Sequence, residues 1–109
     1  MDNIKNNEYY VEKILSDLKF VIDHTQGKTK KEIEEDELLI DSIMFRVIQI
    51  AENSMKLDES FQKQNSNIPW RAIRGMRNMI VHHYGAVDLS VVYDTVKTSI
   101  PELYKALSS

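Results

Sequence analysis

The fold of this chain is decided by the stretch LLIDSIMFRVIQIA, residues 38–51. Ten of these fourteen residues are apolar, and they recur at the three- and four-residue spacing that predicts a helix, here from about Glu34 to Leu57. The apolar residues extend around several sides of that helix, so it is expected to lie at the centre of a bundle or to contribute to an interface. In a chain of 109 residues, we therefore consider self-association as well as burial.

Helical periodicity continues on both sides of this stretch. Upstream, apolar residues at the same spacing predict a first helix from about Ile4 to His24, which ends at Gly27. The charged run Lys28–Glu37 is expected to be a connection into the second helix. Downstream, the polar segment Asp58–Asn67 is expected to be a loop, with room for one helical turn.

Two further helices are predicted in the second half of the chain. Pro69 is suited to the first turn of a third helix, and Gly85 is expected to end that helix as a C-terminal cap. Asp88 is expected to cap a fourth helix, which Pro101 should break or bend near Ser99. The pattern thus predicts alternating helices and short connections.

Composition supports an all-α fold. Apolar residues make up 42% of the chain and charged residues 28%, which excludes a disordered chain. Only three Gly and two Pro are present, too few for the many turns of an all-β fold, and the absence of Cys excludes disulfides and thiolate chemistry. No apolar run reaches the roughly 20 residues of a membrane span, and no signal-peptide core is seen, so a cytoplasmic protein is expected. We predict a single domain over residues 1–109, folded as an up-and-down bundle of four to five helices.

The net charge of −3 conceals an uneven distribution. Residues 1–60 carry 14 acidic and 8 basic residues, whereas residues 61–109 carry 3 acidic and 6 basic ones. No carboxylate occurs between Glu59 and Asp88, a segment that contains Lys63, Arg71, Arg74, Arg77, His82 and His83. Such a segment predicts a local positive surface that attracts an anion such as phosphate. The alternative is that the arginines pair with the acidic first half.

The third predicted helix carries its polar residues on one face. On a helical wheel, where each residue advances by about 100°, the polar residues of this helix fall within about 60° of Arg71. The apolar residues lie on the opposite side, towards the expected core. The polar stripe comprises Arg71, Arg74, Gly75, Asn78 and His82, and the apolar set comprises Ala72, Ile73, Met76, Met79 and Ile80. Arg77 lies on the flank near Tyr84. Gly75 permits another group to approach closely.

Arginine and histidine on one helix suit a phosphodiester substrate. Guanidinium groups bind phosphate oxygens in bidentate fashion and stabilise the extra negative charge of the transition state. A histidine with a pKa of about 6.5 can accept the proton of a ribose 2′-hydroxyl or protonate the leaving oxygen. The alternative is a solvated basic face with a histidine that favours the helix dipole. The pair His82-His83 does not favour a metal site, because adjacent residues point about 100° apart and no third ligand is suitably spaced.

The pattern R-x4-H-x-Y, with Asn directly after Arg, occupies residues 77–84 (RNMIVHHY). It resembles the signature of the HEPN superfamily in its HepT-like branch. The preceding segment 68–76 (IPWRAIRGM) and the following Asp88-Leu89 agree with that family, and the resemblance spans most of the chain. The run Ala51-Glu52-Asn53 departs from the usual Gly-Glu-Ala of the family.

The resemblance implies an α-helical homodimer that cleaves RNA in a cleft between its subunits, without a metal or other cofactor. Such proteins are endoribonuclease toxins of type VII toxin–antitoxin systems, encoded beside an MntA-type nucleotidyltransferase antitoxin. Carried over to this chain, Arg77 and His82 are the catalytic pair and Asn78 supports them. Tyr84 is the hydroxyl to which the antitoxin attaches adenylyl groups, which would place phosphate and bulk where the RNA phosphate should bind. Arg71 and Arg74, on the same polar stripe, are candidates for RNA binding.

One geometric point and one alternative function remain open from the sequence. Residues five apart on an ideal helix diverge by about 140°, so Arg77 and His82 do not share a face. They could converge through the length of the arginine, a loosened last turn before Gly85, or pairing across a dimer. The alternative function is a non-catalytic helical subunit that binds substrate or nucleotide for a two-component nucleotidyltransferase. The intact R-x4-H-x-Y pattern favours the enzyme.

Overall fold

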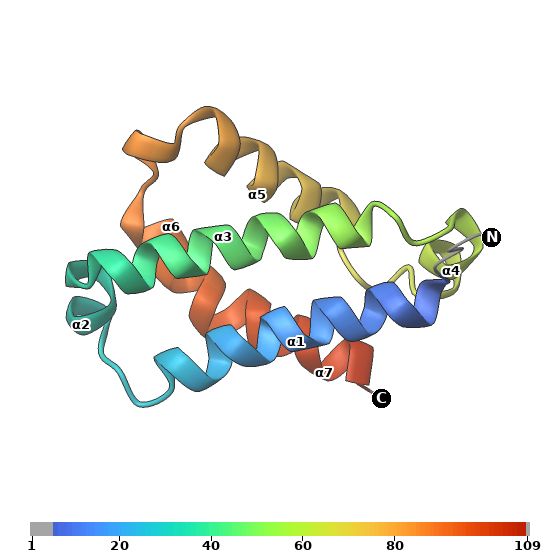
Figure 1. The fold of residues 1–109 in the computed structure, drawn as a ribbon, viewed down its shortest axis with the longest axis horizontal. Coiled ribbons are helices and arrows are strands. Elements are labelled where there is room, and N and C mark those ends of the chain that lie inside the picture. Colours follow the sequence, from blue (N-terminus) through green and yellow to red (C-terminus); the bar gives the residue numbers. More distant parts are fainter. Residues whose placement is uncertain (1–5, 109) are drawn as a thin grey trace.

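The computed structural model describes residues 6–108, and within that range the chain forms helices joined by short connections, with no strand (Figure 1). Four long helical segments form the bundle, with two short helices between them. In chain order the elements are α1 (Asn7–Thr25), α2 (Lys30–Glu35), α3 (Glu37–Ser54), α4 (Glu59–Gln64), α5 (Trp70–His82), a 3₁₀ turn (Tyr84–Ala86), α6 (Leu89–Asp94), a π-helical turn (Thr95–Ser99) and α7 (Ile100–Ser108). The predicted all-α bundle is confirmed.

Helix α1 begins where a side chain satisfies its first free amide groups. The side chain of Asn6 accepts a hydrogen bond from the backbone N–H of Tyr9 at 3.0 Å, as an N-cap residue does. The predicted start at Ile4 lies outside the described residues. The predicted end at Gly27 is confirmed: Gly27 has a φ of 78°, a left-handed conformation that favours glycine and turns the chain away from the helix axis.

The charged segment Lys28–Glu37 is not a simple connection, and that prediction is wrong. It contains α2, because Thr29 and Glu32 form a reciprocal capping box that satisfies two free amide groups. The hydrogen bond from the Thr29 backbone lowers the pKa of the Glu32 carboxyl. Ile33, fully buried, fixes this short helix to the core. Asp36 then caps α3 through the N–H of Leu39, so α3 begins at Glu37 rather than Glu34.

Helix α3 is the centre of the bundle. It packs against α1 on one side and α5 on the other, and α1 in turn packs against α7. Seven apolar side chains of α3 are buried, namely Leu39, Ile40, Ile43, Met44, Val47, Ile50 and Ala51. Two apolar residues face outward: Leu38 is 80% exposed and Phe45 is 56% exposed. The helix is central to the bundle, as one of the two predictions stated. Its exposed apolar side chains also leave a surface that could contribute to an interface, as the other prediction stated.

The loop before α5 holds the helical turn that the sequence allowed. Asp58 caps α4 by accepting the N–H of Phe61. The indole N–H of Trp70 donates to the backbone carbonyls of Gln62 and Asn65, each at 3.2 Å. These hydrogen bonds hold the start of α5 at Trp70, so Pro69 is the N-cap residue and not part of the first turn, where it was predicted.

The predicted end of this helix at Gly85 is wrong. Helix α5 ends at His82, and the chain continues through a 3₁₀ turn in which Gly85 does not adopt a positive φ. His83, with φ −133° and ψ 33°, leaves the helical conformation first. A left-handed glycine is therefore not what stops the helix.

Pro101 does not break the last helical segment; near Ser99, where a break or a bend was predicted, the structure has a π-helical turn over Thr95–Ser99. The chain passes from α6 through the π-helical turn into α7, where Pro101 lies in the first turn. The backbone N–H of Ile100 donates to the carbonyl of Thr95, the i→i−5 bond of a π turn. This wider turn relieves the clash that a proline ring makes with the preceding helical turn.

No helix within the described residues is long and apolar enough to cross a membrane.

Candidate active site

Helix α5 positions the residues of the R-x4-H-x-Y pattern. Ile80 is 1% exposed and anchors the helix in the core, with Ile73, Met76 and Met79 partly buried beside it. Two side-chain contacts tie this part of the chain to α3: Arg77 contacts Glu52, and Tyr84 contacts Asp41. The later residue, Tyr84, contacts the earlier position on α3, so α5 runs antiparallel to α3, as Figure 1 also shows.

Arg77 is held by two oxygen acceptors. Its Nε and Nη2 lie 2.9 and 2.7 Å from one carboxylate oxygen of Glu52, and its Nη1 donates to the side-chain oxygen of Asn78 at 2.9 Å. The side chains of Arg77 and Glu52 are 30% and 39% exposed. A guanidinium bound on two sides is pre-oriented while one face stays open to solvent. Glu52 and Asn78 therefore position Arg77 at the surface.

His82 is exposed at the end of α5, and its ring makes no hydrogen bond or ion pair with the described residues. The neighbouring His83 is exposed as well. An exposed imidazole at a helix end is accessible to a ligand from solvent. It also lies where a positive charge is favoured by the helix dipole.

Arg77 and His82 lie on different faces of the same helix. Both residues belong to the continuous helix α5, so the loosened last turn considered above does not occur before His82. On such a helix they are about 140° apart around the axis and about 7.5 Å apart along it. The hydrogen bonds to Glu52 direct the Arg77 guanidinium towards α3.

The rest of the polar stripe lies at the surface. Arg71 and Arg74 are exposed and form no ion pair with the described residues, so the positive charge of this segment is only partly neutralised by the acidic first half. A side chain at Gly75 would meet nothing within 4 Å, which leaves room there for another molecule. Ala72, expected to face the core, is exposed.

Tyr84 is tied to α3 by a short hydrogen bond. Its hydroxyl donates to Oδ1 of Asp41 at 2.7 Å, although the side chain is 48% exposed. The hydrogen bond to Asp41 raises the pKa of the Tyr84 phenol, because the carboxylate stabilises the protonated form and its charge opposes the phenolate. Tyr84 is therefore a protonated and accessible hydroxyl.

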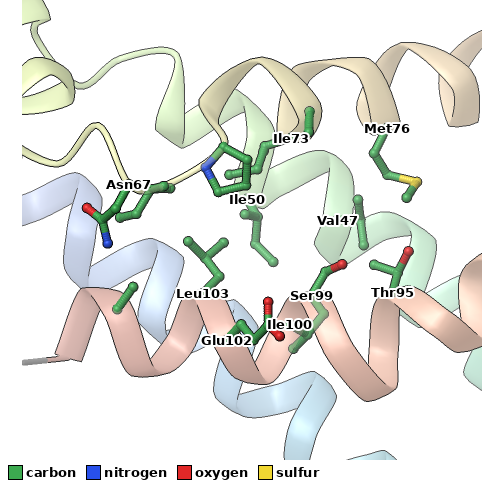
Figure 2. A pocket seen from close by; sticks show the side chains of 14 residues that line it. Val47, Ile50, Asn67, Ile73, Met76, Thr95, Ser99, Ile100, Glu102 and Leu103 are labelled. Carbon is green, nitrogen blue, oxygen red and sulfur yellow. The ribbon is translucent and has the colours of Figure 1, made fainter.

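A cavity of about 350 Å³ lies on the other side of α5, between that helix and α7 (Figure 2). Its walls are mostly apolar and include Ile50, Ile73, Met76 and Leu103. Neither Arg77 nor His82 lines it, so the cavity is separate from the candidate site. Within residues 6–108, no three His, Asp or Glu side chains gather in a way that could hold a metal ion.

Two residues of the site were missed by the sequence reasoning. Glu52 lies in the run Ala51-Glu52-Asn53, and its place in that family run was the available signal for a role near the motif. Asp41 is 43 residues from Tyr84, and no local pattern links them.

An all-α bundle that presents arginine and histidine on one helix fits a class of small helical nucleases. Comparison with known proteins makes this specific. Residues 14–109 match the family model described as Ribonuclease HepT-like. The chain therefore belongs to the HepT-like ribonuclease family, within the HEPN superfamily, and is an RNA-cleaving enzyme.

Individual relatives agree with this assignment. A candidate RNase of Caldanaerobacter subterraneus is 29% identical over 102 residues, covering 94% of this chain and 91% of that protein. A candidate ribonuclease HepT of Thermococcus cleftensis is 33% identical over 93 residues, covering 82% of this chain and 84% of that protein. No solved structure matches the chain significantly.

Proposed function

We propose that this chain is a metal-independent endoribonuclease whose site is completed across a homodimer, with Arg77 of one subunit and His82 of the other acting on the same phosphodiester. The observation that carries the proposal is the fixed divergence of the two side chains. Arg77 is held towards α3 by Glu52, and His82 lies about 140° away on the same continuous helix. A second copy can supply the missing partner.

The proposed chemistry uses the groups that this helix exposes. His82 accepts the proton of a ribose 2′-hydroxyl as the 2′-oxygen bonds to the phosphorus and the bond to the 5′-oxygen breaks, and the protonated His82 then gives that proton to the leaving 5′-oxygen. Arg77 stabilises the negative charge that accumulates on the phosphate oxygens in the transition state. Arg71 and Arg74 bind the neighbouring backbone phosphates, and Asn78 keeps Arg77 in place through its hydrogen bond.

Exposed apolar side chains on α3 and α5 support self-association on this face. Leu38 and Phe45 lie two turns apart on the outer side of α3, and Val81 is exposed on α5 between Arg77 and His82. On a helical wheel Val81 lies within the 140° gap between the two catalytic candidates, together with Arg74 and Asn78. If this surface, which consists of Leu38 and Phe45 on α3 and Val81 on α5, packs against the same surface of a second copy, Arg77 of one subunit comes near His82 of the other.

We further propose that the chain acts as one domain over residues 1–109, in the cytoplasm, as the toxin of a type VII toxin–antitoxin system. Its antitoxin is an MntA-type nucleotidyltransferase that adenylylates Tyr84. The exposed, protonated hydroxyl of Tyr84 supports this, as does its place two residues after His82. An adenylyl group there would add negative charge beside the RNA-binding helix and exclude the substrate.

The composite site is tested by mixing two inactive variants, Arg77→Ala and His82→Ala. If the residues act across the dimer, random re-association restores about one quarter of the wild-type cleavage rate. Half of the dimers then contain one subunit of each variant. In such a dimer one of the two sites keeps both Arg77 and His82, whereas the other site lacks both. If the residues act within one chain, the mixture stays inactive. Purified single variants that retain full activity would refute the catalytic assignment itself.

Cleavage is measured on RNA in the presence of EDTA, with size-exclusion chromatography to follow the dimer. Metal-free cleavage that disappears in both single variants supports the ribonuclease mechanism. RNA or nucleotide binding by the wild type without any cleavage would instead support the non-catalytic subunit of a two-component nucleotidyltransferase. Mass spectrometry of Tyr84 after co-expression with an MntA-type nucleotidyltransferase tests the regulatory part.

A further inference from the structure

The contact between Asp41 and Tyr84 joins two parts of the chain that lie 43 residues apart. The phenol donates to Oδ1 of Asp41 at 2.7 Å, and both side chains reach solvent. This distance lies within the range of about 2.6–3.2 Å that a general base needs from the atom whose proton it accepts. The pair is therefore an acceptor and a hydroxyl in reactive geometry, open to a second molecule.

The other side-chain contacts of α3 do not explain why an aspartate stands at position 41. The N-cap of α3 is Asp36, and Asp41 forms no ion pair with the described residues. Its neighbours on the outer face of α3, Leu38 and Phe45, are exposed apolar residues one turn away on either side. The phenol of Tyr84 is the partner to which this carboxylate is directed.

We infer that Asp41 is the general base of Tyr84 adenylylation, supplied by the modified protein itself. The inference rests on the proposed function, because it concerns the reaction at Tyr84. In this step Oη of Tyr84 forms a bond to the α-phosphorus of a nucleoside triphosphate. The bond between that phosphorus and the bridging oxygen to the β-phosphate breaks, and pyrophosphate leaves. The phenolic proton passes to Oδ1 of Asp41.

The charges around the hydroxyl explain why a base is needed. Near neutral pH the phenol is protonated, and the carboxylate beside it opposes a free phenolate, so attack by a preformed phenolate is disfavoured. Transfer of the proton during attack avoids that species. It also leaves Asp41 neutral, which removes the repulsion between its carboxylate and the new phosphodiester. General-base catalysis of this kind contributes about 10²–10⁴-fold in rate.

The test compares Asp41→Asn with the wild type. Asparagine keeps the size and the oxygen acceptor, so it can still orient Tyr84, but it has no basic carboxylate. Each protein is incubated with an MntA-type nucleotidyltransferase, ATP and Mg²⁺, and the rate of Tyr84 modification is followed by mass spectrometry. We expect a loss of about 10²-fold or more in that rate for Asp41→Asn. Asp94→Asn, at an exposed aspartate with no cap contact, is the matched control and should react like the wild type.

A pH series separates a base from a merely structural residue. If Asp41 is the base, the asparagine variant depends on phenolate, so the ratio of wild-type to variant rate falls as pH rises from 7 to 9. A ratio that stays constant over this range, or equal rates for the two proteins, would overturn the inference and leave Tyr84 modification intact. If wild-type Tyr84 is not modified at all, the proposed regulation falls and the inference falls with it.

Discussion

Replacing Glu52 by alanine tests how far the site depends on a residue outside the motif. Glu52 provides one carboxylate oxygen that contacts Nε and Nη2 of Arg77 at 2.9 and 2.7 Å. Two unit charges about 4 Å apart attract by about 4 kcal/mol at an effective dielectric constant near 20. Both side chains are partly exposed, so screening and side-chain ordering reduce the net contribution to about 0.5–1 kcal/mol. We therefore expect Glu52→Ala to lower the melting temperature by only about 2–5 °C.

The effect on cleavage should be much larger than the effect on stability. Without Glu52, Arg77 keeps one hydrogen bond, to Asn78, and its guanidinium is free to move away from α3. A displacement of about 1 Å of a catalytic group costs about 10²-fold in rate. We expect the initial cleavage rate to fall by about that factor at 25 °C, where the variant remains folded. The assay is the initial rate on a short RNA oligonucleotide, with circular dichroism melting measured in parallel.

Asp17→Asn is the matched control for Glu52→Ala. Like Glu52, Asp17 binds an arginine: its carboxylate lies 2.7 Å from the guanidinium of Arg46 on α3. The side chain of Asp17 is only 12% exposed. Loss of this more buried pair should lower stability at least as much, yet it lies between α1 and α3 and should leave cleavage near the wild-type rate. Wild-type cleavage by Glu52→Ala would refute the positioning role. An equal loss of cleavage in Asp17→Asn would show that stability alone accounts for the effect.

Three further predictions concern the core, a helix cap and pH. Ile80→Ala should lower the free energy of unfolding by about 2–5 kcal/mol, measured by urea denaturation, because it leaves a cavity beneath α5. Asp36→Ala should cost about 1 kcal/mol in the same assay, since it removes the N-cap of α3. Tyr84 should titrate above the ordinary tyrosine pKa by ultraviolet absorbance, and Asp41→Asn should lower its pKa. Because the pKa of the folded state is raised, this contact stabilises the protein at pH values below the ordinary tyrosine pKa. That contribution is lost as pH rises through the folded-state value.

Much of the bundle could be predicted because helices follow a local period. The apolar spacing located α1, α3, α5 and the C-terminal segment, and the cap at Gly27 matched its left-handed turn. The errors occurred where two local signals compete. The charged segment around Thr29 looked like a connection, but its capping box and the buried Ile33 form a short helix. Pro101 was expected to break or bend a helix near Ser99, and the π turn before it accommodates the proline without a break.

The site was predictable to a different degree. The motif residues could be placed on one helix, and Arg77 and His82 could be seen to diverge, because both statements depend only on helical geometry. Glu52 and Asp41 could not be paired with Arg77 and Tyr84. Those contacts depend on which face of α3 meets α5 and on how far the two helices are offset. Neither is encoded in a local pattern.

The sequence by itself determined that the chain is an all-α bundle and that arginine, asparagine and histidine share one helix, since these features follow from residue spacing along the chain. Only the tertiary structure decided which carboxylates hold Arg77 and Tyr84. The reason is physical. A helix fixes the directions of its own side chains, but the packing of α5 against α3 selects the partners that those side chains meet.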